Sequence, residues 1–438
     1  LLPGVLGRKL NKQAVFDYLS LQFVPGAHSI FDGIERIPPG SRFRFDLASR
    51  TLHIESYHQH HFSLHDANSN SQSLSSLGQS FRVAVESWMQ SDAPVGISLS
   101  GGIDSALITG IAAEMNAEPV NTYSLGFRDS SGPDETDLSR LVARKWQTNH
   151  REILVQASDF VDELRPMVRA LAEPYAGGLP SWFVYKAMAS EVKVAITGTG
   201  GDELFGNYGK WKPYARPIDK LRKIAREFHL GSSWRDYAHG PGAFIAHLYF
   251  RDTLKRGILE DSFSADLYPT ERIFRDWPFR ADAETAVQQV SKLDWSLQLP
   301  DEFLLATDRF SMAHSIEART PFLDQDFVAQ ALSIPGSFRS SLRAPKKLLI
   351  DQLGGLLPPE LIGARKRGFI ASEAYLMETV LGHEVKRLLS KDFLYSQGIF
   401  KAKETGELAT QFFQGRRRLS AKLWTLFMFQ LWFEEYLT

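Results

Sequence analysis

Residues 95–105 read VGISLSGGIDS, a short apolar strand that passes through a Gly-Gly turn into a helix. Glycine lets backbone N–H groups approach an anion closely, and the N-terminus of the following helix adds a favourable dipole. Asp104 does not suit a loop that only cradles phosphates, because phosphates repel a carboxylate unless a cation lies between them. Asp104 is therefore a candidate Mg²⁺ ligand. The alternative is a plain turn in which Asp104 caps the helix.

A second glycine-rich loop, TGTGGDELFG at residues 197–206, also follows an apolar strand. It matches neither the dinucleotide-binding fingerprint nor the Walker A pattern. Because the carboxyl ends of parallel strands lie at one edge of a sheet, the two loops are expected to face each other. Asp104 and Asp202 are then predicted to hold one Mg²⁺ on the phosphates of a nucleotide.

Strand and helix signals alternate around these loops, which predicts an α/β fold with a parallel sheet and helices on both faces. After about residue 285 the helical signals dominate, and the tail 419–436 is expected to be an amphipathic helix packed in the core. The predicted helices span 77–88, 103–115, 138–146 and 182–189, and the predicted strands lie at 95–99, 122–127, around 153–154 and at 192–197.

The first sixty residues have a different sequence pattern. Residues 42–46 alternate as RFRFD between turn signals, which predicts short strands. The Ser- and Asn-rich run that follows is typical of a linker. We therefore predict a small β-rich domain over 1–62, a linker over 63–78 and the main domain over 79–438. The alternative is a long surface loop inside one domain.

Composition excludes several classes of function. Lys and Arg number 50 against 51 Asp and Glu, so no global charge favours nucleic acid or an anionic membrane. Cysteine is absent, which excludes disulfides and a cysteine nucleophile within these residues. The longest apolar stretch, 423–433, is too short for a membrane span, which needs about 20 residues. The first residues lack a signal-peptide pattern. We expect a cytoplasmic protein without nucleic-acid or membrane partners.

A basic cluster, RKR at 365–367, is preceded by Arg343, Lys346 and Lys347. Positive charge near a phosphate site stabilises the charge that develops at phosphorus. The alternative is a solvated surface patch.

Together these motifs resemble the asparagine synthetase (glutamine-hydrolysing) family, whose synthetase domain belongs to the ATP pyrophosphatase, or PP-loop, superfamily. The resemblance covers about residue 80 to the C-terminus and rests on SGGIDS at 100–105, TGTGGDELFGNY at 197–208 and DRFSMAHSIEARTPFLD at 308–324. Residues 1–57 resemble the end of the family's class II glutamine amidotransferase domain. The N-terminal cysteine nucleophile of that domain is missing, so we expect no glutaminase activity from this chain alone.

The resemblance implies an amide-forming ligase that uses ATP and Mg²⁺. A carboxylate, aspartate in the parent activity, is adenylated with release of pyrophosphate, and an amine then displaces AMP. The alternatives are a relative that joins another carboxylate and amine, as β-lactam synthetases and lasso-peptide cyclases do, and a non-catalytic ATP-binding protein. The implied partners are a small-molecule or peptide carboxylate, ammonia or another amine, and a glutaminase domain of its own or on a separate chain. A homodimer is left open.

Residue roles carry over by motif position. The phosphate-binding positions are Ser100, Gly101, Gly102 and Ser105. The metal ligands are Asp104 and Asp202. The positions that contact adenosine through the backbone are Leu99 and Leu125, and those near the α-phosphate are Thr197 and Gly198.

Two lysines and a charged pair complete the implied site. Lys366 occupies the position of the family's catalytic lysine, and Lys346 occupies a second common lysine position. Glu317 and Arg319 lie where the family builds its pocket for the acceptor carboxylate, the alternative being a structural ion pair. Thr199 replaces a usual Glu or Asp, so the identity of the acid and the amine does not follow from the resemblance.

Overall fold

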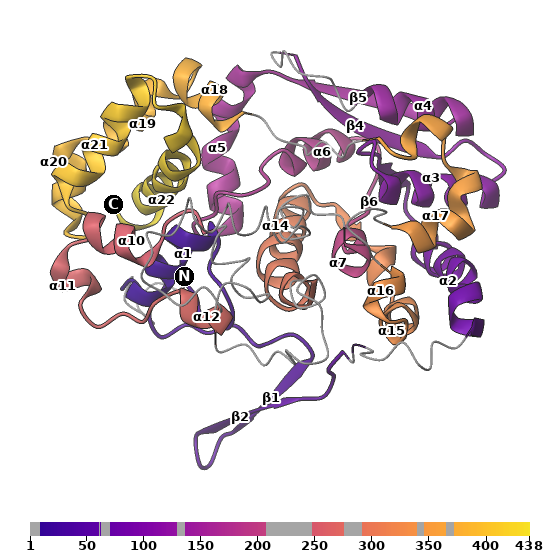
Figure 1. The fold of residues 1–438 in the computed structure, drawn as a ribbon, viewed down its shortest axis with the longest axis horizontal. Helices are drawn as coiled ribbons and strands as arrows, with labels where there is room; N and C mark the ends of the chain where they lie inside the picture. Colours follow the sequence, from indigo (N-terminus) through magenta and orange to yellow (C-terminus); the bar gives the residue numbers. More distant parts are fainter. Residues whose placement is uncertain are drawn as a thin grey trace.

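The structure, a computed structural model, describes residues 9–60, 62, 71–128, 136–206, 248–275, 291–339, 346–364 and 372–438. Its centre is a five-stranded sheet in the order β5-β4-β3-β6-β7, with every neighbouring pair parallel (Figure 1). The strands are β3 (Val95–Ser98), β4 (Asn121–Phe127), β5 (Asn149–Val155), β6 (Val194–Ile196) and β7 (Glu317–Arg319).

Helices cover both faces of the sheet, because successive strand residues point to opposite sides. Val194 and Ile196 join one buried core, whereas Ala195 between them joins the other. The first core contains side chains of α2 (Ser71–Met89), α3 (Ile103–Met115), α4 (Thr136–Trp146), α15 (Gln325–Ser333) and α17 (Lys347–Leu353). The second contains those of α5 (Ala157–Leu171) and α6 (Ser181–Met188). The predicted α/β class is confirmed.

The predicted elements differ from the observed ones mainly at their ends. The helix expected over 103–115 has those bounds. Helix α2 begins at Ser71, so residues 71–78 of the predicted linker belong to a helix. Strand β7 lies in the part of the chain where helical signals dominate, and it was not predicted. Its three residues are too few to show a strand period in the sequence.

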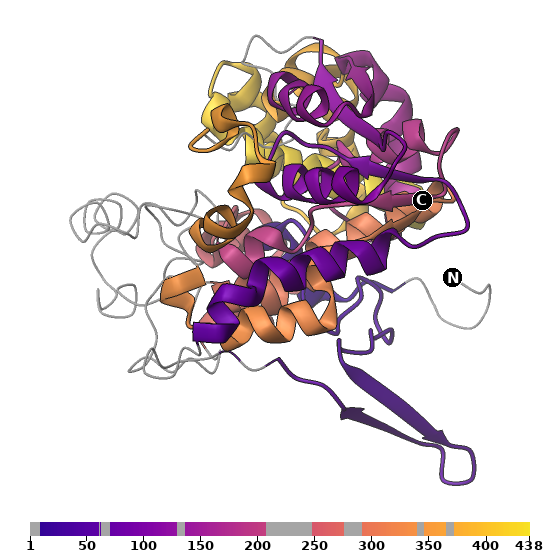
Figure 2. The ribbon, with the colours of Figure 1, turned by 90° about the vertical axis from the view of Figure 1, so that its right-hand side faces the viewer.

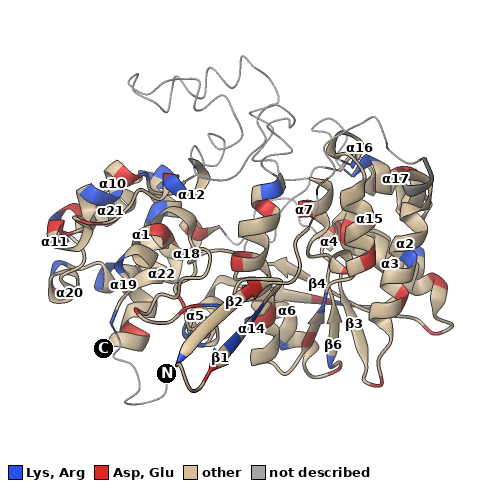
Figure 3. Cartoon of the chain, turned by 90° about the horizontal axis from the view of Figure 1, so that it is seen from below, with Lys and Arg blue, Asp and Glu red and all other residues tan. Residues whose placement is uncertain are grey.

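An exposed hairpin of β1 (Ser41–Asp46) and β2 (Thr51–Ser56) projects from the body (Figure 2). The strands are antiparallel, with Phe43 opposite Ile54. The strand predicted at 42–46 is therefore confirmed. Figure 3 shows acidic and basic residues interspersed over the helices, in keeping with the balanced composition.

Helix α1 (Lys12–Leu21) packs in the same core as the last helix of the chain, α22 (Ser420–Leu437). The hydroxyl of Tyr18 donates to the carbonyl of Thr425 at 2.9 Å. Lys255 is fully buried beside α1, with its Nζ 3.1 Å from the carbonyl of Phe16 and 2.7 Å from Asp252 Oδ1. Burial lowers the pKa of Lys255 to about 8. The Tyr18 hydrogen bond thus joins α1 to the last helix, while Lys255 joins α1 to the segment that contains residues 252–255.

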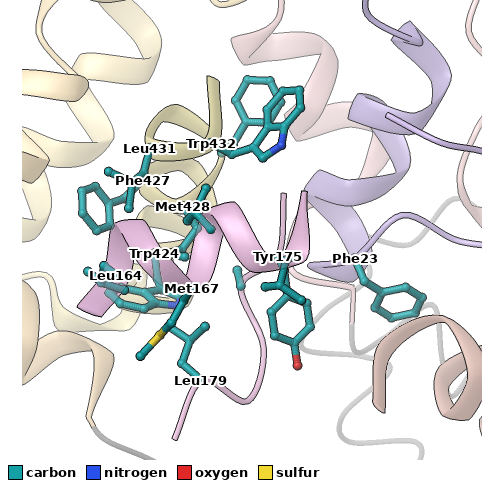
Figure 4. Packing of buried hydrophobic residues seen from close by; sticks show 14 of the residues in the cluster. Phe23, Leu164, Met167, Tyr175, Leu179, Trp424, Phe427, Met428, Leu431 and Trp432 are labelled. Atoms are coloured by element: carbon teal, nitrogen blue, oxygen red, sulfur yellow. The ribbon is translucent and has the colours of Figure 1, made fainter. Parts of the chain in front are cut away.

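The tail is a helix packed in the core, as expected, but the expectation that it is amphipathic is wrong. The ten successive residues from Leu423 to Trp432 are all buried, so α22 is enclosed on every side. In Figure 4 side chains of α22, such as Met428, lie against Met167 of α5.

The remaining described elements are short. They are α7 (Gly201–Phe205), α10 (Asp252–Ile258), α11 (Asp261–Ser264), α12 (Glu271–Arg275), the π-helix η3 (Asp294–Leu304), α14 (Leu305–Ala313), η4 (Pro321–Leu323), α16 (Gly336–Arg339), η5 (Gly354–Leu356), η6 (Pro359–Leu361), α18 (Glu373–Thr379), α19 (Gly382–Leu388), α20 (Lys391–Gln397), α21 (Ala402–Phe413) and η7 (Arg417–Leu419).

An ionic network fastens α22 to α5 and α19. Glu434 accepts from Arg387 at 2.7 Å and from Arg165 at 2.5 Å, and Glu384 accepts from both arginines. Hydrogen bonds from Arg387, followed by those from Arg165, lower the pKa of Glu434 to about 2. The ionised form of Glu434 therefore stabilises the fold.

The change Glu434→Gln is expected to lower the free energy of unfolding at pH 7 by about 1–2 kcal/mol. A lowered pKa contributes stability above the unfolded value of about 4.3 and loses it as the pH falls toward 2. The variant should therefore lose less stability than the wild type between pH 5 and pH 3, as measured by urea unfolding. Glu55→Gln, in the exposed pair with Arg42, is the control and should change little. An equal acid response of the Glu434 variant and the wild type would contradict this.

Candidate functional site

Two glycine-rich loops meet at the point where the order of the strands reverses, between β3 and β6. From β3 the chain adds β4 and β5 on one side, and it returns to place β6 on the other side of β3. Ile97 of β3 is in register with Ile196 of β6, so residues 99–102 and 197–200 leave neighbouring strands at the same edge. This is the switch point at which open α/β sheets bind ligands. The predicted meeting of the two loops is confirmed.

The first loop is shaped by Ser105. Its hydroxyl accepts from the backbone N–H of Ser100 at 3.1 Å and donates to the carbonyl of Gly102 at 3.2 Å. Gly101 has a φ of 69°, which favours glycine. Gly102 is the N-cap of α3, and no side chain caps this helix. The first N–H groups of α3 therefore suit an anion at this edge.

The second loop packs directly against the first. A Cβ at Gly198 would lie 2.9 Å from the Cβ of Asp104, which shows how closely the two backbones approach. Gly200 has a φ of +94°, and a Cβ there would lie 2.5 Å from a methyl carbon of Leu323. The hydroxyl of Thr197 donates to that of Thr199 at 3.1 Å. Close contact therefore favours glycine at both positions, and at Gly200 the backbone conformation favours it as well.

The two predicted aspartates share a lysine. The Nζ of Lys346 lies 2.7 Å from Asp202 Oδ1 and also pairs with Asp104 Oδ2. The side chains of Lys346, Asp104 and Asp202 are 1%, 13% and 9% exposed. One ammonium group between two carboxylates leaves the trio with a formal charge of −1. Such a trio can attract a cation.

The aspartates fit the Mg²⁺ that the sequence predicts. Among the described residues, Oδ1 of Asp104 is buried and has no hydrogen-bond partner, although it can still accept a bond. Mg²⁺ is commonly held by one or two carboxylates together with phosphates and water. No group of three or more metal-ligating side chains occurs in the described ranges.

Leu99 and Leu125 lie at the same edge as the loops, but their side chains are buried in the two opposite cores. The backbone N–H of Leu99 donates to the carbonyl of Tyr123 at 2.7 Å. Both side chains thus belong to the cores, and the backbone contact with adenosine that the family resemblance implies stays a prediction.

Glu317 and Arg319 form an ion pair on β7, with 2.8 Å between Arg319 Nε and Glu317 Oε1. Arg319 also donates to the carbonyls of Trp88 and Gln90 at the end of α2, at 3.0 and 2.7 Å. A cation at the C-terminus of a helix is favoured by the helix dipole. These contacts are those of the structural alternative, and the role of this pair in carboxylate binding stays a prediction.

The basic cluster is only partly described. Lys366 and its neighbours at 365–367 lie outside the described residues, as does Arg343, so their predicted roles stay predictions. Lys347 is largely exposed and pairs with Asp351 on the surface. The sequence indicated Lys346 as a lysine of uncertain role, but no sequence signal indicated that it bridges the two aspartates. The packing of Leu323 on Gly200 was also missed.

A parallel sheet with two glycine-rich loops at its switch point is consistent with the fold of a PP-loop synthetase domain. The chain matches the asparagine synthase family over residues 76–434, and it belongs to that family. Family membership assigns the chain to the ATP-dependent amide-forming ligases.

Two relatives from Bacillus subtilis strain 168 illustrate the similarity. "Asparagine synthetase [glutamine-hydrolyzing] 1" is 24% identical over 442 residues, which cover 97% of this chain and 69% of the relative. "Asparagine synthetase [glutamine-hydrolyzing] 3" is 26% identical over 373 residues, which cover 78% of this chain and 55% of the relative. None of the described helices is both long and apolar enough to cross a bilayer.

Proposed function

We propose that the chain adenylates a carboxylate and passes the activated acyl group to an amine. The observation that supports this most strongly is the contact between the two loops, with Asp104, Asp202 and Lys346 gathered where they meet. A site that combines unused helix N–H groups with a pair of carboxylates suits a nucleotide carrying a divalent cation.

The proposed reaction has two steps. A carboxylate oxygen of the acid attacks the α-phosphorus of ATP, the bond from that phosphorus to the bridging oxygen breaks, and pyrophosphate leaves. The amine nitrogen then attacks the acyl carbon, the bond from this carbon to the AMP oxygen breaks, and the nitrogen loses a proton as the amide forms. Adenylation thus converts a poor leaving group into a good one.

The residues of the site have two roles, which are binding of the nucleotide and stabilisation of charge. The backbone of the first loop, with the hydroxyl of Ser100, binds the β- and γ-phosphates, while Thr197 and Gly198 lie beside the α-phosphate. Asp104 and Asp202 would hold Mg²⁺, which supplies charge neutralisation for the leaving pyrophosphate. Lys366 stabilises adenylation and the later tetrahedral intermediate, in the role that the family resemblance implies.

The first candidate reaction is asparagine formation from aspartate and ammonia, since two relatives are named as asparagine synthetases. The second candidate reaction joins a different carboxylate and amine. Thr199 favours it, because Thr199 stands where the family usually has Glu or Asp. The glutamine-hydrolysing step named for the relatives would need a separate glutaminase domain or a further part of this polypeptide.

The test is a pyrophosphate-release assay with ATP and Mg²⁺, run with and without L-aspartate and with ammonium or hydroxylamine as the amine. We expect release that depends on a carboxylate, with AMP formed in equal amount. Release with aspartate and formation of asparagine would establish the first reaction, while dependence on another acid would establish the second. ATP hydrolysis to ADP and phosphate, or no binding of ATP at all, would reject the proposed function.

A further inference from the structure

We propose that the ammonium group of Lys346 takes the place of the divalent cation in the protein without nucleotide. The ammonium group lies between Asp104 and Asp202 until a metal-bound nucleotide displaces it. This inference rests on the proposed function of the same site. It concerns the protein before the nucleotide arrives, and it makes Lys346 a residue that sets the order in which metal and nucleotide bind.

The position of the ammonium group is the first argument. Lysine usually extends its charged end into water, yet the side chain of Lys346 is 1% exposed and ends between the two carboxylates. It donates a charge-assisted hydrogen bond to Asp104 Oδ2, and it forms a close ion pair with Asp202 Oδ1 at 2.7 Å. A divalent cation bound to both aspartates would have to take this place.

The backbone of Lys346 gives the second argument. The residue precedes α17 with a φ of 59°, the left-handed region that a side chain with a Cβ seldom adopts. Such a conformation stores strain and persists only where surrounding contacts hold it. Here the side chain is held by its two ion pairs, so their loss would favour a second arrangement of Lys346.

The charges at the site give the third argument, because they determine whether a free or a nucleotide-bound metal ion can bind. A free metal ion would push the ammonium off the carboxylates and leave it buried without a partner, which is strongly unfavourable. A nucleotide-bound metal brings phosphate oxygens that can accept hydrogen bonds from the displaced ammonium. Metal and nucleotide are therefore expected to enter together, with little binding of the metal alone.

The experiment measures the binding of Mn²⁺ alone, by electron paramagnetic resonance, to the full chain without nucleotide. Lys346→Met removes the charge and keeps most of the stem, so it should bind Mn²⁺ at least about tenfold more tightly than the wild type. The same variant should bind the magnesium complex of a non-hydrolysable ATP analogue at least about tenfold more weakly, because the phosphate partner is lost. Lys347→Met, at the exposed neighbouring lysine, is the matched control and should change neither affinity.

A merely structural role for Lys346 would weaken both kinds of binding together, so opposite changes are the diagnostic result. Asp104→Asn added to Lys346→Met should abolish the gain in Mn²⁺ affinity. Unchanged or weaker Mn²⁺ binding by a folded Lys346→Met or Lys346→Gln variant would overturn the inference. So would saturable wild-type binding of Mn²⁺ below about 0.1 mM without nucleotide, a result that needs no variant. Failure of the wild type to bind the ATP analogue would instead reject the proposed function, independently of the Mn²⁺ result.

Discussion

Asp104→Asn and Asp202→Asn are each expected to lower the rate of ATP-dependent pyrophosphate release by at least about 10²-fold. Each change removes one negative charge from the pair that faces Lys346, and with it one ligand of the cation that neutralises pyrophosphate. The asparagine keeps the volume of the side chain and an oxygen that can still accept a hydrogen bond from Lys346. The loss should therefore appear in turnover and nucleotide affinity more than in the melting temperature.

The matched control is Asp351→Asn, which removes a half-exposed carboxylate paired with Lys347 at the surface. It changes the net charge of the chain by the same amount and should keep wild-type pyrophosphate release. Comparable losses in all three variants would point to a general effect of charge. Near-wild-type turnover in the Asp104 or Asp202 variant would remove that residue from the site.

Local patterns were sufficient to predict β3, β4, β5 and β6 of the sheet and the two glycine-rich loops. The strand at 95–98 and the helix at 103–115 are adjacent in the chain, and each is a mainly apolar run beside the Gly-Gly turn. The meeting of the loops followed from a general rule on parallel strands rather than from any pairwise signal. For the same reason the two aspartates could be predicted to act together.

Other features depend on contacts between distant parts of the chain. Lys346 is 242 residues from Asp104 in sequence, and nothing in its neighbourhood distinguishes it from the exposed Lys347. The strand β7 exists because its three residues extend the sheet beside β6, not because they have a strong strand pattern. Helix α22 has an apolar residue at nearly every buried position because helices from distant parts of the chain, such as α1, α5 and α19, surround it. Such surroundings are set by tertiary packing, which overrides local periodicity.

The contact between the loops leads to a second large expected effect, in Gly201→Ala. A Cβ at Gly201 would lie 2.6 Å from both Cγ and Oδ1 of Asp104, well inside van der Waals contact. Asp104 is short and tied to Lys346, so it cannot move aside without leaving its ion pair. Because misplacement by about 1 Å can cost about 10²-fold in rate, pyrophosphate release should fall by about that factor. The new methyl group lies in helix α7, where alanine is favoured over glycine, so the fold itself should persist.

Gly257→Ala supplies the matched comparison, because Gly257 also lies in a helix and a Cβ there would meet nothing within 4 Å. This control should keep full activity and gain about 0.5–1 kcal/mol in the free energy of unfolding, through the reduced freedom of the unfolded chain. The two variants therefore share one chemical change and differ only in what the new methyl group touches. If Gly201→Ala released pyrophosphate as fast as Gly257→Ala, the contact between the second loop and Asp104 would have no part in catalysis. A loss confined to Gly201→Ala, with both variants folded, would show that the reaction requires the close approach of these two loops.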